Sequence, residues 1–246
     1  MRLKNLFITG FRNIESVRFS PVQHFNLIHG HNGQGKTNLL EALYLLGNPR
    51  SFRNARLPDF ISYGGKQAQI KGEIESSGIN THIKVTLENA GRRVELDGKS
   101  IQRASDLYGR INTVIFSPDD TNMVKLGPEL RRRYLDRSVY ICDAAYLQSW
   151  HGYHRVLKQR NQLLKTSDKN GLEIWTEQLA ETGSRVIVSR QHFVQRLSHR
   201  LRQHYGTISG NQETACITYL PEGVRSTEQT QIKSELLELF ERHLHN

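Results

Sequence analysis

The stretch Gly30-His31-Asn32-Gly33-Gln34-Gly35-Lys36-Thr37 decides how the rest of the chain is interpreted. It fits the pattern G-x-x-x-x-G-K-[ST], in which glycines let phosphate oxygens lie against bare backbone. The N-terminus of the following helix adds partial positive charge. In this pattern Lys36 reaches the β- and γ-phosphates, and the Thr37 hydroxyl binds Mg²⁺. The motif therefore predicts a binding loop for ATP and Mg²⁺, with Thr37 as the metal ligand.

The residues on either side of this loop support the interpretation. Residues 25–28 are apolar and predict a short buried strand that leads into the loop. Residues 36–46 carry an apolar face at helical spacing, and Gly47-Asn48-Pro49 ends it. The alternative is a glycine-rich turn that merely carries a lysine, and the strand and helix in the expected order favour the phosphate loop.

The rest of the first 125 residues alternates between apolar and polar positions. This period of two predicts strands around residues 3–8, 17–19, 68–74 and 79–87. Asp97-Gly98 predicts the tip of a hairpin, because both residues tolerate the positive φ angles of a tight turn. Residues 111–116 predict a last apolar strand. The expected fold is α/β: a P-loop NTPase head with an antiparallel β subsheet.

After Gly127-Pro128 the pattern becomes mainly helical. Residues 185–205 and 230–244 have amphipathic helix spacing, whereas residues 214–220 predict a strand. The change of pattern predicts a domain boundary near residues 123–128, between the part with the ATP-binding loop over residues 1–125 and a helical part over 126–205, which a remainder over 206–246 follows.

Composition narrows the class of protein. The 246 residues carry 34 Lys and Arg against 24 Asp and Glu, a formal net charge of +10, which agrees equally well with a polyanionic partner such as nucleic acid and with a role in solubility alone. Two cysteines exclude a disulfide scaffold or a four-cysteine zinc site. No apolar run approaches the ~20 residues of a membrane span. We therefore expect a cytoplasmic protein that does not act at a membrane.

Hydrolysis by a phosphate loop also needs an acid that positions Mg²⁺ and water. Asp119 and Asp120 follow an apolar stretch, and Glu222 follows another, but a proline intervenes in both places. Neither segment is a clean apolar strand closed by an acid. Helix capping is the alternative role for the two aspartates, and it is the commoner one.

The basic and aromatic residues of the helical part have two interpretations. Arg131-Arg132-Arg133 and the arginines between residues 185 and 202 either contact phosphates or form ion pairs and a solvated helix face. Tyr134, Tyr140, Tyr146, Trp150 and Tyr153 either stack on bases or form the core of the arm. Helical spacing favours the solvated face and the core.

Several separate blocks resemble one known family. These blocks are the segments Leu3-Lys4-Asn5-Leu6, Gly10-Phe11-Arg12-Asn13, residues 26–52, Phe116-Ser117-Pro118-Asp119 and residues 123–136. In this order they resemble the RecF proteins of bacterial DNA replication and repair, closely to about residue 136 and more loosely to the end.

The resemblance implies that residues 1–125 form the ATP-binding lobe of a head similar to ABC- and SMC-type ATPases. It also implies that residues 126–205 form a smaller helical arm domain, and that residues 206–246 are the remainder of the arm, which returns toward the head. It implies ATP and Mg²⁺ at residues 30–37, Arg12 and Asn13 near the base and sugar of the nucleotide, and Asp119 in the loop from head to arm. It also implies binding of single-stranded or gapped DNA, RecO- and RecR-like partners, recombinational repair and SOS induction. Weak DNA-dependent ATP hydrolysis and an ATP-dependent homodimer belong to the same family expectation.

The sequence departs from this family pattern in its last part. No L-S-x-G-Q-like signature segment and no clean Walker B acid occur. We therefore expect a head that is truncated before these two motifs, which leaves hydrolysis and dimerisation open for this chain. A P-loop kinase, or another ABC- or SMC-type ATPase, is the alternative. A small acceptor substrate would indicate the first, and a long coiled coil the second.

Overall fold

The computed structural model describes residues 1–246 except 54, 103–110, 126, 167–169 and 246. Contacts divide the chain into two units, Met1–Thr121 and Asn122–Asn246, here called the sheet unit and the helical unit. The boundary lies just before the change from strand-like to helical pattern in the sequence.

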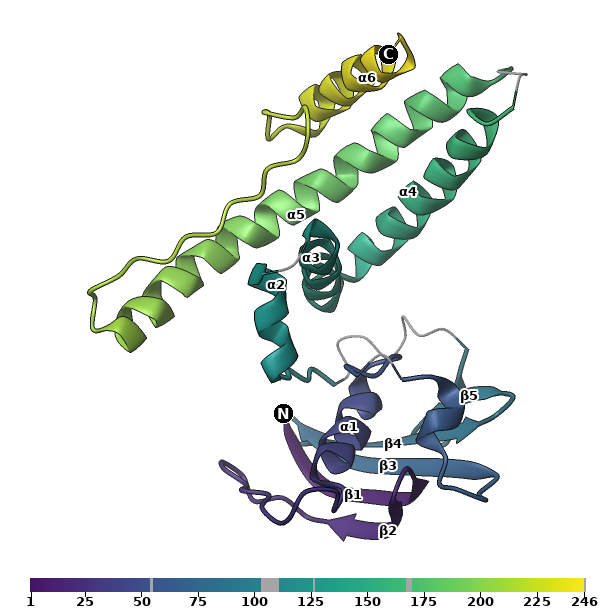
Figure 1. The fold of residues 1–246 in the computed structure, drawn as a ribbon, viewed down its shortest axis with the longest axis vertical. Coiled ribbons are helices and arrows are strands. Elements are labelled where there is room, and N and C mark those ends of the chain that lie inside the picture. The colour runs from purple at the N-terminus through teal and green to yellow at the C-terminus, as the bar shows by residue number, and fades with distance from the viewer. Residues whose placement is uncertain (54, 103–110, 126, 167–169, 246) are drawn as a thin grey trace. The chain divides into compact units, whose positions relative to one another are not determined.

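Six antiparallel strands form one sheet in the sheet unit (Figure 1). The sheet order is β2-β1-β3-β4-β5-β6, so β1 pairs with β3 across 55 intervening residues rather than only with its neighbour in the chain. Buried and exposed positions alternate along β3, as the period of two predicts. The strand bounds are β1 Arg2–Phe11, β2 Ile14–Phe19, β3 Gln67–Ser76, β4 Ile79–Glu88, β5 Gly91–Leu96 and β6 Lys99–Ile101.

The predicted hairpin tip joins β5 to β6. Asp97 and Gly98 have φ angles of 48° and 79°, and Leu96 pairs with Lys99 across the turn. Two consecutive positive φ angles are what a two-residue hairpin turn needs, so the Asp-Gly prediction is confirmed.

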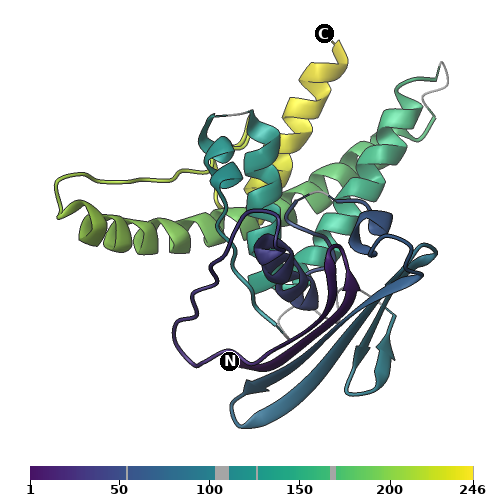
Figure 2. The ribbon, with the colours of Figure 1, turned by 60° about the horizontal axis from the view of Figure 1, so that its bottom comes forward.

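One helix, α1 (Lys36–Gly47), packs on one face of this sheet (Figure 2). Leu45 and Leu46 of the helix and Leu6 and Ile8 of β1 are almost completely buried in the shared core. Arg92 of β5 donates to the carbonyls of Leu45 and Asn48 and so satisfies the end of the helix. A short 3-10 helix, Leu57–Phe60, adds Phe60, which stacks on Phe11 with ring centroids 5.8 Å apart.

Three predicted strands are wrong. Residues 25–28, 111–116 and 214–220 have no strand structure. Phe25 and Leu27 are 77% and 74% exposed. A strand exists only where a neighbouring strand takes its backbone hydrogen bonds, and no described strand pairs with these segments. Local apolar pattern alone does not supply that partner.

The helical unit is built around a pair of long helices, α4 and α5, with α6 packed on α5 (Figure 1). The segment 211–228 runs back along α5 without regular structure, and Gln191 on α5 donates to the Ser226 carbonyl. Within the described residues no helix is long and apolar enough to cross a membrane. The helix bounds are α2 Asn122–Lys125, α3 Pro128–Cys142, α4 Ala144–Leu163, α5 Leu172–Ser209 and α6 Gln229–His245.

Asp136 of α3 organises the centre of this unit. Its carboxylate accepts from Arg190 Nε at 2.8 Å, the Tyr146 hydroxyl at 2.5 Å and Trp150 Nε1 at 3.0 Å. Burial, together with the hydrogen bond to Asp136, raises the pKa of Tyr146 well above its usual range. Tyr140 and Tyr153 pack on the same cluster. The aromatic side chains therefore form core, as predicted, except Tyr134, which is 45% exposed.

Candidate nucleotide-binding site

The glycines of residues 30–37 adopt backbone conformations that other residues avoid. Gly30, Gly33 and Gly35 have φ angles of 146°, 82° and 92°. A Cβ on Gly30 would lie 2.6 Å from Gln34 Oε1, and a Cβ on Gly35 would lie 2.8 Å from Asn13 Oδ1. Both space and dihedral angles thus explain why glycine occupies positions 30 and 35.

Lys36 folds back over the start of the loop. Its Nζ donates to the carbonyl oxygens of Gly30 and His31, each at 2.7 Å. The His31 amide in turn donates to Gln34 Oε1 at 3.1 Å, which closes the loop on itself. An ammonium group has three protons, so two carbonyls leave one proton directed away from these acceptors.

The N-terminus of α1 begins inside this loop. Gly35 is the residue before the helix and Lys36 is its first residue. The Gly35 carbonyl accepts from the Leu39 amide at 2.9 Å, and the N–H groups before Leu39 have no partner within the helix. These N–H groups and the helix dipole favour an anion here. Thr37 is exposed on the first turn, so its hydroxyl is accessible.

Asn13 connects the end of β1 to the loop. Its Nδ2 donates to the Gly33 carbonyl at 2.8 Å, and its Oδ1 accepts from Asn38 Nδ2 at 2.7 Å. Arg12, by contrast, directs its guanidinium to Glu41 of α1, with Nε 2.5 Å from Oε2. The structure therefore brings Arg12 and Asn13 to the predicted loop, but only Asn13 touches it.

The candidate acids outside the loop have local roles or none. Asp120 accepts from the Ser117 amide at 2.6 Å and the Ser117 hydroxyl at 3.0 Å, at the start of the 3-10 helix Pro118–Thr121. This agrees with a capping role. The Asp119 side chain lies outside the described residues, and Glu222 is exposed in a segment without regular structure.

Glu41 is the site residue that sequence reasoning missed. It is fully buried on α1, five residues after Lys36, and binds Arg12. The signal was present: Glu41 is an acid within the otherwise apolar run Leu39-Leu40-Glu41-Ala42-Leu43. A buried carboxylate needs a charged or hydrogen-bonding partner, so an acid within an apolar run predicts one.

A glycine loop that leads into a helix covering an antiparallel sheet, followed by a helical unit, defines a P-loop ATPase head with a helical arm. The family model described as RecF/RecN/SMC N terminal domain matches residues 2–217. A "DNA replication and repair protein RecF" from Trichlorobacter lovleyi is 49% identical over 93% of this chain and 62% of its own length. The protein of that name from Geobacter sulfurreducens is 41% identical over 99% of the chain and 67% of its own length.

A solved structure described as "the recombination mediator protein RecF-ATP in RecFOR pathway" matches with a TM-score of 0.90 and 31% identity. The match covers 99% of this chain and 68% of that one. The chain belongs to the RecF family. It spans about 62% of the length of the Trichlorobacter relative. The kinase alternative is not favoured.

Proposed function

We propose that this chain binds ATP with Mg²⁺ at residues 30–37 and acts on DNA in recombinational repair, as RecF-type proteins do. The observation that carries the nucleotide part is the loop geometry. Three glycines of the loop have positive φ angles, the loop leads directly into the N-terminus of α1, and the Lys36 amino group folds back over the start of the loop. The name of the solved RecF structure includes ATP, which supports the same ligand.

Each loop residue has a role that follows from its position. The backbone N–H groups of residues 33–37 bind phosphate oxygens, and the third proton of Lys36 Nζ binds a β- or γ-phosphate oxygen. The Thr37 hydroxyl is a hard oxygen ligand of the kind that Mg²⁺ takes together with phosphate oxygens. His31, Asn32 and Gln34 are exposed and line the entrance.

Equilibrium binding of a fluorescent ATP analogue tests this proposal. Lys36→Ala should weaken binding at least tenfold, because a charged hydrogen bond to phosphate is lost. Thr37→Ala should weaken binding only when Mg²⁺ is present. Lys66→Ala, at an exposed lysine outside the loop, is the matched control and should bind as the parent chain does. Unchanged affinity in both loop variants would show that the nucleotide binds elsewhere or not at all.

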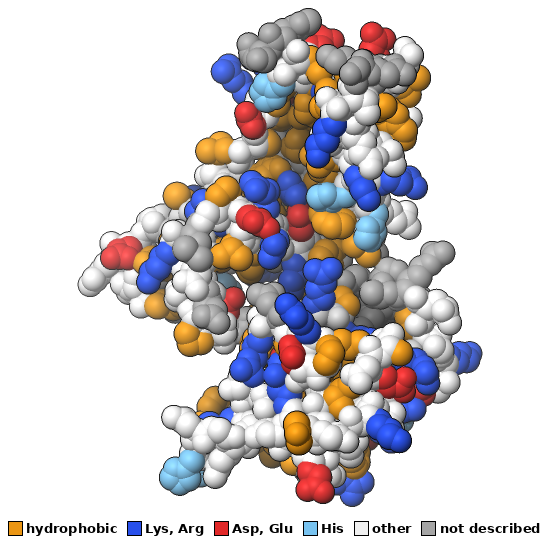
Figure 3. Space-filling model, turned by 45° about the vertical axis from the view of Figure 1, so that its right-hand side comes forward, with side chains coloured by type: hydrophobic (Ala, Val, Ile, Leu, Met, Phe, Trp, Pro, Cys, Tyr) orange, Lys and Arg blue, Asp and Glu red, His pale blue; other side chains and the backbone are white. Residues whose placement is uncertain are grey.

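We propose α5 as the DNA contact of the helical unit. Residues 182–212 contain no Asp or Glu but carry Arg185, Arg190, Arg196, Arg200 and Arg202. Arg190 is committed to Asp136 and Arg185 to Glu181. The other three arginines are exposed on α5 together with His199 and His204. On the face drawn in Figure 3, Lys and Arg side chains are more prominent than acidic ones.

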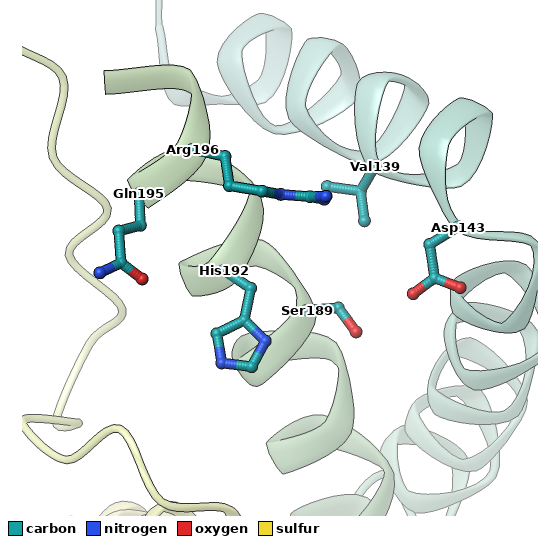
Figure 4. A pocket seen from close by; sticks show the side chains of 6 residues that line it. All are labelled: Val139, Asp143, Ser189, His192, Gln195 and Arg196. Atoms are coloured by element: carbon teal, nitrogen blue, oxygen red, sulfur yellow. The ribbon is translucent and has the colours of Figure 1, made fainter. Parts of the chain in front are cut away.

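A hollow of about 380 Å³ lies beside this part of α5 (Figure 4). His192 and Arg196 of α5 line the hollow together with Asp143, the residue before α4, and the Asp143 carboxylate already accepts from the Ala145 amide at 3.0 Å. The acid disfavours a phosphate within the hollow. Arg196 lines the hollow but is exposed, as Arg200 and Arg202 are, so we expect phosphates at these three side chains where they face solvent rather than deep inside the hollow.

The salt dependence of single-stranded DNA binding tests this surface. Replacing Arg196, Arg200 and Arg202 by Gln should weaken binding and reduce the slope of log K against log salt by about 2, at roughly 0.7 per lost phosphate contact. Arg131→Gln, Arg132→Gln and Arg133→Gln together make the matched control, because the same charge is removed from exposed arginines of α3. Equal losses in both triple variants would mean that the arginines of α5 contribute no more to DNA binding than those of α3, and would overturn α5 as the preferred contact.

Assembly is the remaining part of the proposal. Family membership supports RecO- and RecR-like partners and an ATP-dependent homodimer, and the RecFOR name of the solved relative supports the same partners. Light scattering of the chain with and without ATP and Mg²⁺ tests the dimer. A mass that stays that of a monomer at saturating ATP would remove the dimer from the proposal.

A further inference from the structure

A buried carboxylate lies directly behind the candidate nucleotide loop. Glu41 is 0% exposed, and both of its oxygens bind Arg12, Nε at 2.5 Å and Nη2 at 2.9 Å. Ser51 also donates to Glu41, and Arg53 Nη1 lies 3.6 Å from its Oε2. Two guanidinium groups thus share one carboxylate. None of these residues belongs to the loop motif.

The network returns to the loop through two asparagines. Arg53 Nη1 donates to Asn38 Oδ1 at 3.0 Å, and Asn38 Nδ2 donates to Asn13 Oδ1 at 2.7 Å. Asn13 follows Arg12 in the chain, so the contacts form a closed ring from Glu41 through Arg12, Asn13, Asn38 and Arg53 back to Glu41. We call these five residues the Glu41 ring.

The ring has one contact with the phosphate loop itself. Asn13 Nδ2 donates to the Gly33 carbonyl at 2.8 Å. Arg12 has a left-handed backbone, φ 52°, which a residue with a Cβ adopts only at a cost in free energy. Its amide donates to the Phe60 carbonyl at 2.9 Å, and its guanidinium binds Glu41. Both contacts hold the strained turn that directs Asn13 at Gly33.

We propose that Glu41 is a positioning residue for nucleotide binding, which acts on the loop through Arg12 and Asn13. The inference rests on the proposed nucleotide site. A loop that is already held in its binding conformation loses less conformational freedom when the ligand binds, so affinity rises. Arg53 is 44% exposed. Because two guanidinium groups share one carboxylate, Arg12, Arg53 and Glu41 together carry a net positive charge, which adds positive potential beside the loop.

The competing interpretation is that Glu41 only neutralises Arg12 inside the fold. A purely structural role predicts that Glu41→Gln lowers the stability of the sheet unit and leaves the ATP affinity of the folded protein unchanged. A positioning role predicts a change in affinity that depends on Asn13. The two roles therefore differ in how the substitutions combine, not only in what each one does.

A double-mutant cycle on ATP affinity separates them. Glu41→Gln and Asn13→Ala should each weaken binding about fivefold, the typical effect of one lost hydrogen bond. The double variant should be no weaker than either single one, since both remove the same connection. Asn13 is exposed, so Asn13→Ala should fold, and an unchanged ATP affinity of this single variant would overturn the proposal even if Glu41→Gln folds poorly. Glu73→Gln is the matched control: its carboxylate binds Asn5 on the sheet, at 2.7 Å.

Each outcome of the cycle decides between the interpretations. If the two losses multiply, Asn13 contacts the nucleotide independently and the positioning role of Glu41 is wrong. If Glu41→Gln and Asn13→Ala bind ATP as the parent does while Lys36→Ala fails, only the ring inference is overturned. If Lys36→Ala also retains full affinity, the failure lies in the proposed nucleotide site itself.

Discussion

Replacing Asp136 by Ala should strongly destabilise the helical unit. Asp136 accepts hydrogen bonds from Arg190, Tyr146 and Trp150, and the Asp136 and Arg190 side chains are only 16% and 13% exposed. Removing the carboxylate leaves a buried guanidinium without its counter-charge, which typically costs about 3–5 kcal/mol. With a urea dependence of roughly 2 kcal/mol per molar, the unfolding midpoint should fall by about 2 M.

Tryptophan emission during urea unfolding measures this effect in the full chain. The sequence has two tryptophans, Trp150 and Trp175, and both lie in the helical unit. The emission therefore reports on that unit alone. Glu129→Ala is the matched control, because Glu129 binds Arg133 in an exposed pair four residues apart, with side chains 68% and 67% exposed. Such pairs contribute at most about 0.5 kcal/mol.

A second substitution tests the reasoning behind the magnitude. If the cost arises from the uncompensated charge of Arg190, replacing Arg190 by Met in the Asp136→Ala background should recover part of the lost stability. The reasoning fails if the double variant is as unstable as the sum of the single ones. It also fails if Asp136→Ala shifts the midpoint no more than Glu129→Ala does.

Three further predictions concern glycines and pH. Gly98→Ala should destabilise the sheet unit by about 1 kcal/mol, because the φ angle of Gly98 is 79°. Gly152→Ala within α4 should stabilise the helical unit by a similar amount, because a Cβ at this position meets only Thr182, at 3.7 Å. Urea titrations followed by circular dichroism measure both changes, and changes in stability of the same sign would contradict this reasoning. Gly72→Ala should cost about 1–3 kcal/mol by overpacking against α1, 2.6 Å from a leucine methyl, and an unchanged melting temperature would oppose this. Burial tends to raise the pKa of Glu235, but hydrogen bonds from two backbone amides and a hydroxyl lower it overall. The contribution of Glu235 to stability is therefore full above pH 4.5 and is lost as the pH falls. Glu235→Gln should make the urea midpoint depend less on pH between pH 6 and pH 3, and an unchanged pH profile would refute this.

Local pattern was sufficient where the physical cause is local. The glycine loop, the start of α1 at Lys36 and the Asp97-Gly98 turn depend on a few neighbouring residues, and each was predictable from the sequence. The alternation over β3 and β4 was also readable, because one face of these strands is buried on α1.

Contacts between residues far apart in the chain could not be predicted from the sequence in the same way. The pairing of β1 with β3 and the contact of Asp136 with Arg190, 54 residues apart, depend on the assembled fold. The segments 25–28, 111–116 and 214–220 have strand-like composition, yet strand formation requires a partner edge, which composition does not specify. The sequence of a segment therefore determines its conformational preference, and the tertiary contacts determine whether the segment adopts that conformation.

Among the described residues, the buried carboxylate–arginine pairs Glu41–Arg12 and Asp136–Arg190 differ in what surrounds them, and this difference separates their roles. Asp136 and Arg190 are enclosed by the hydroxyls of Tyr146 and Tyr219 and the indole N–H of Trp150, so their hydrogen-bonding capacity is used inside the core. Glu41 and Arg12 instead lie beside two residues that reach solvent. Arg53 is half-exposed, and the exposed Asn13 donates a hydrogen bond to the phosphate loop.

A pair whose contacts all end in core residues can change only the stability of its unit. A pair whose contacts continue to a binding loop can also change the affinity of that loop, since ligand binding and loop conformation are thermodynamically linked. Substitutions at Asp136 should therefore alter unfolding while leaving ATP affinity per folded molecule constant, and substitutions at Glu41 should alter both. Measuring both quantities on both variants tests this distinction directly: an Asp136→Ala chain that is still folded but binds ATP more weakly would contradict it.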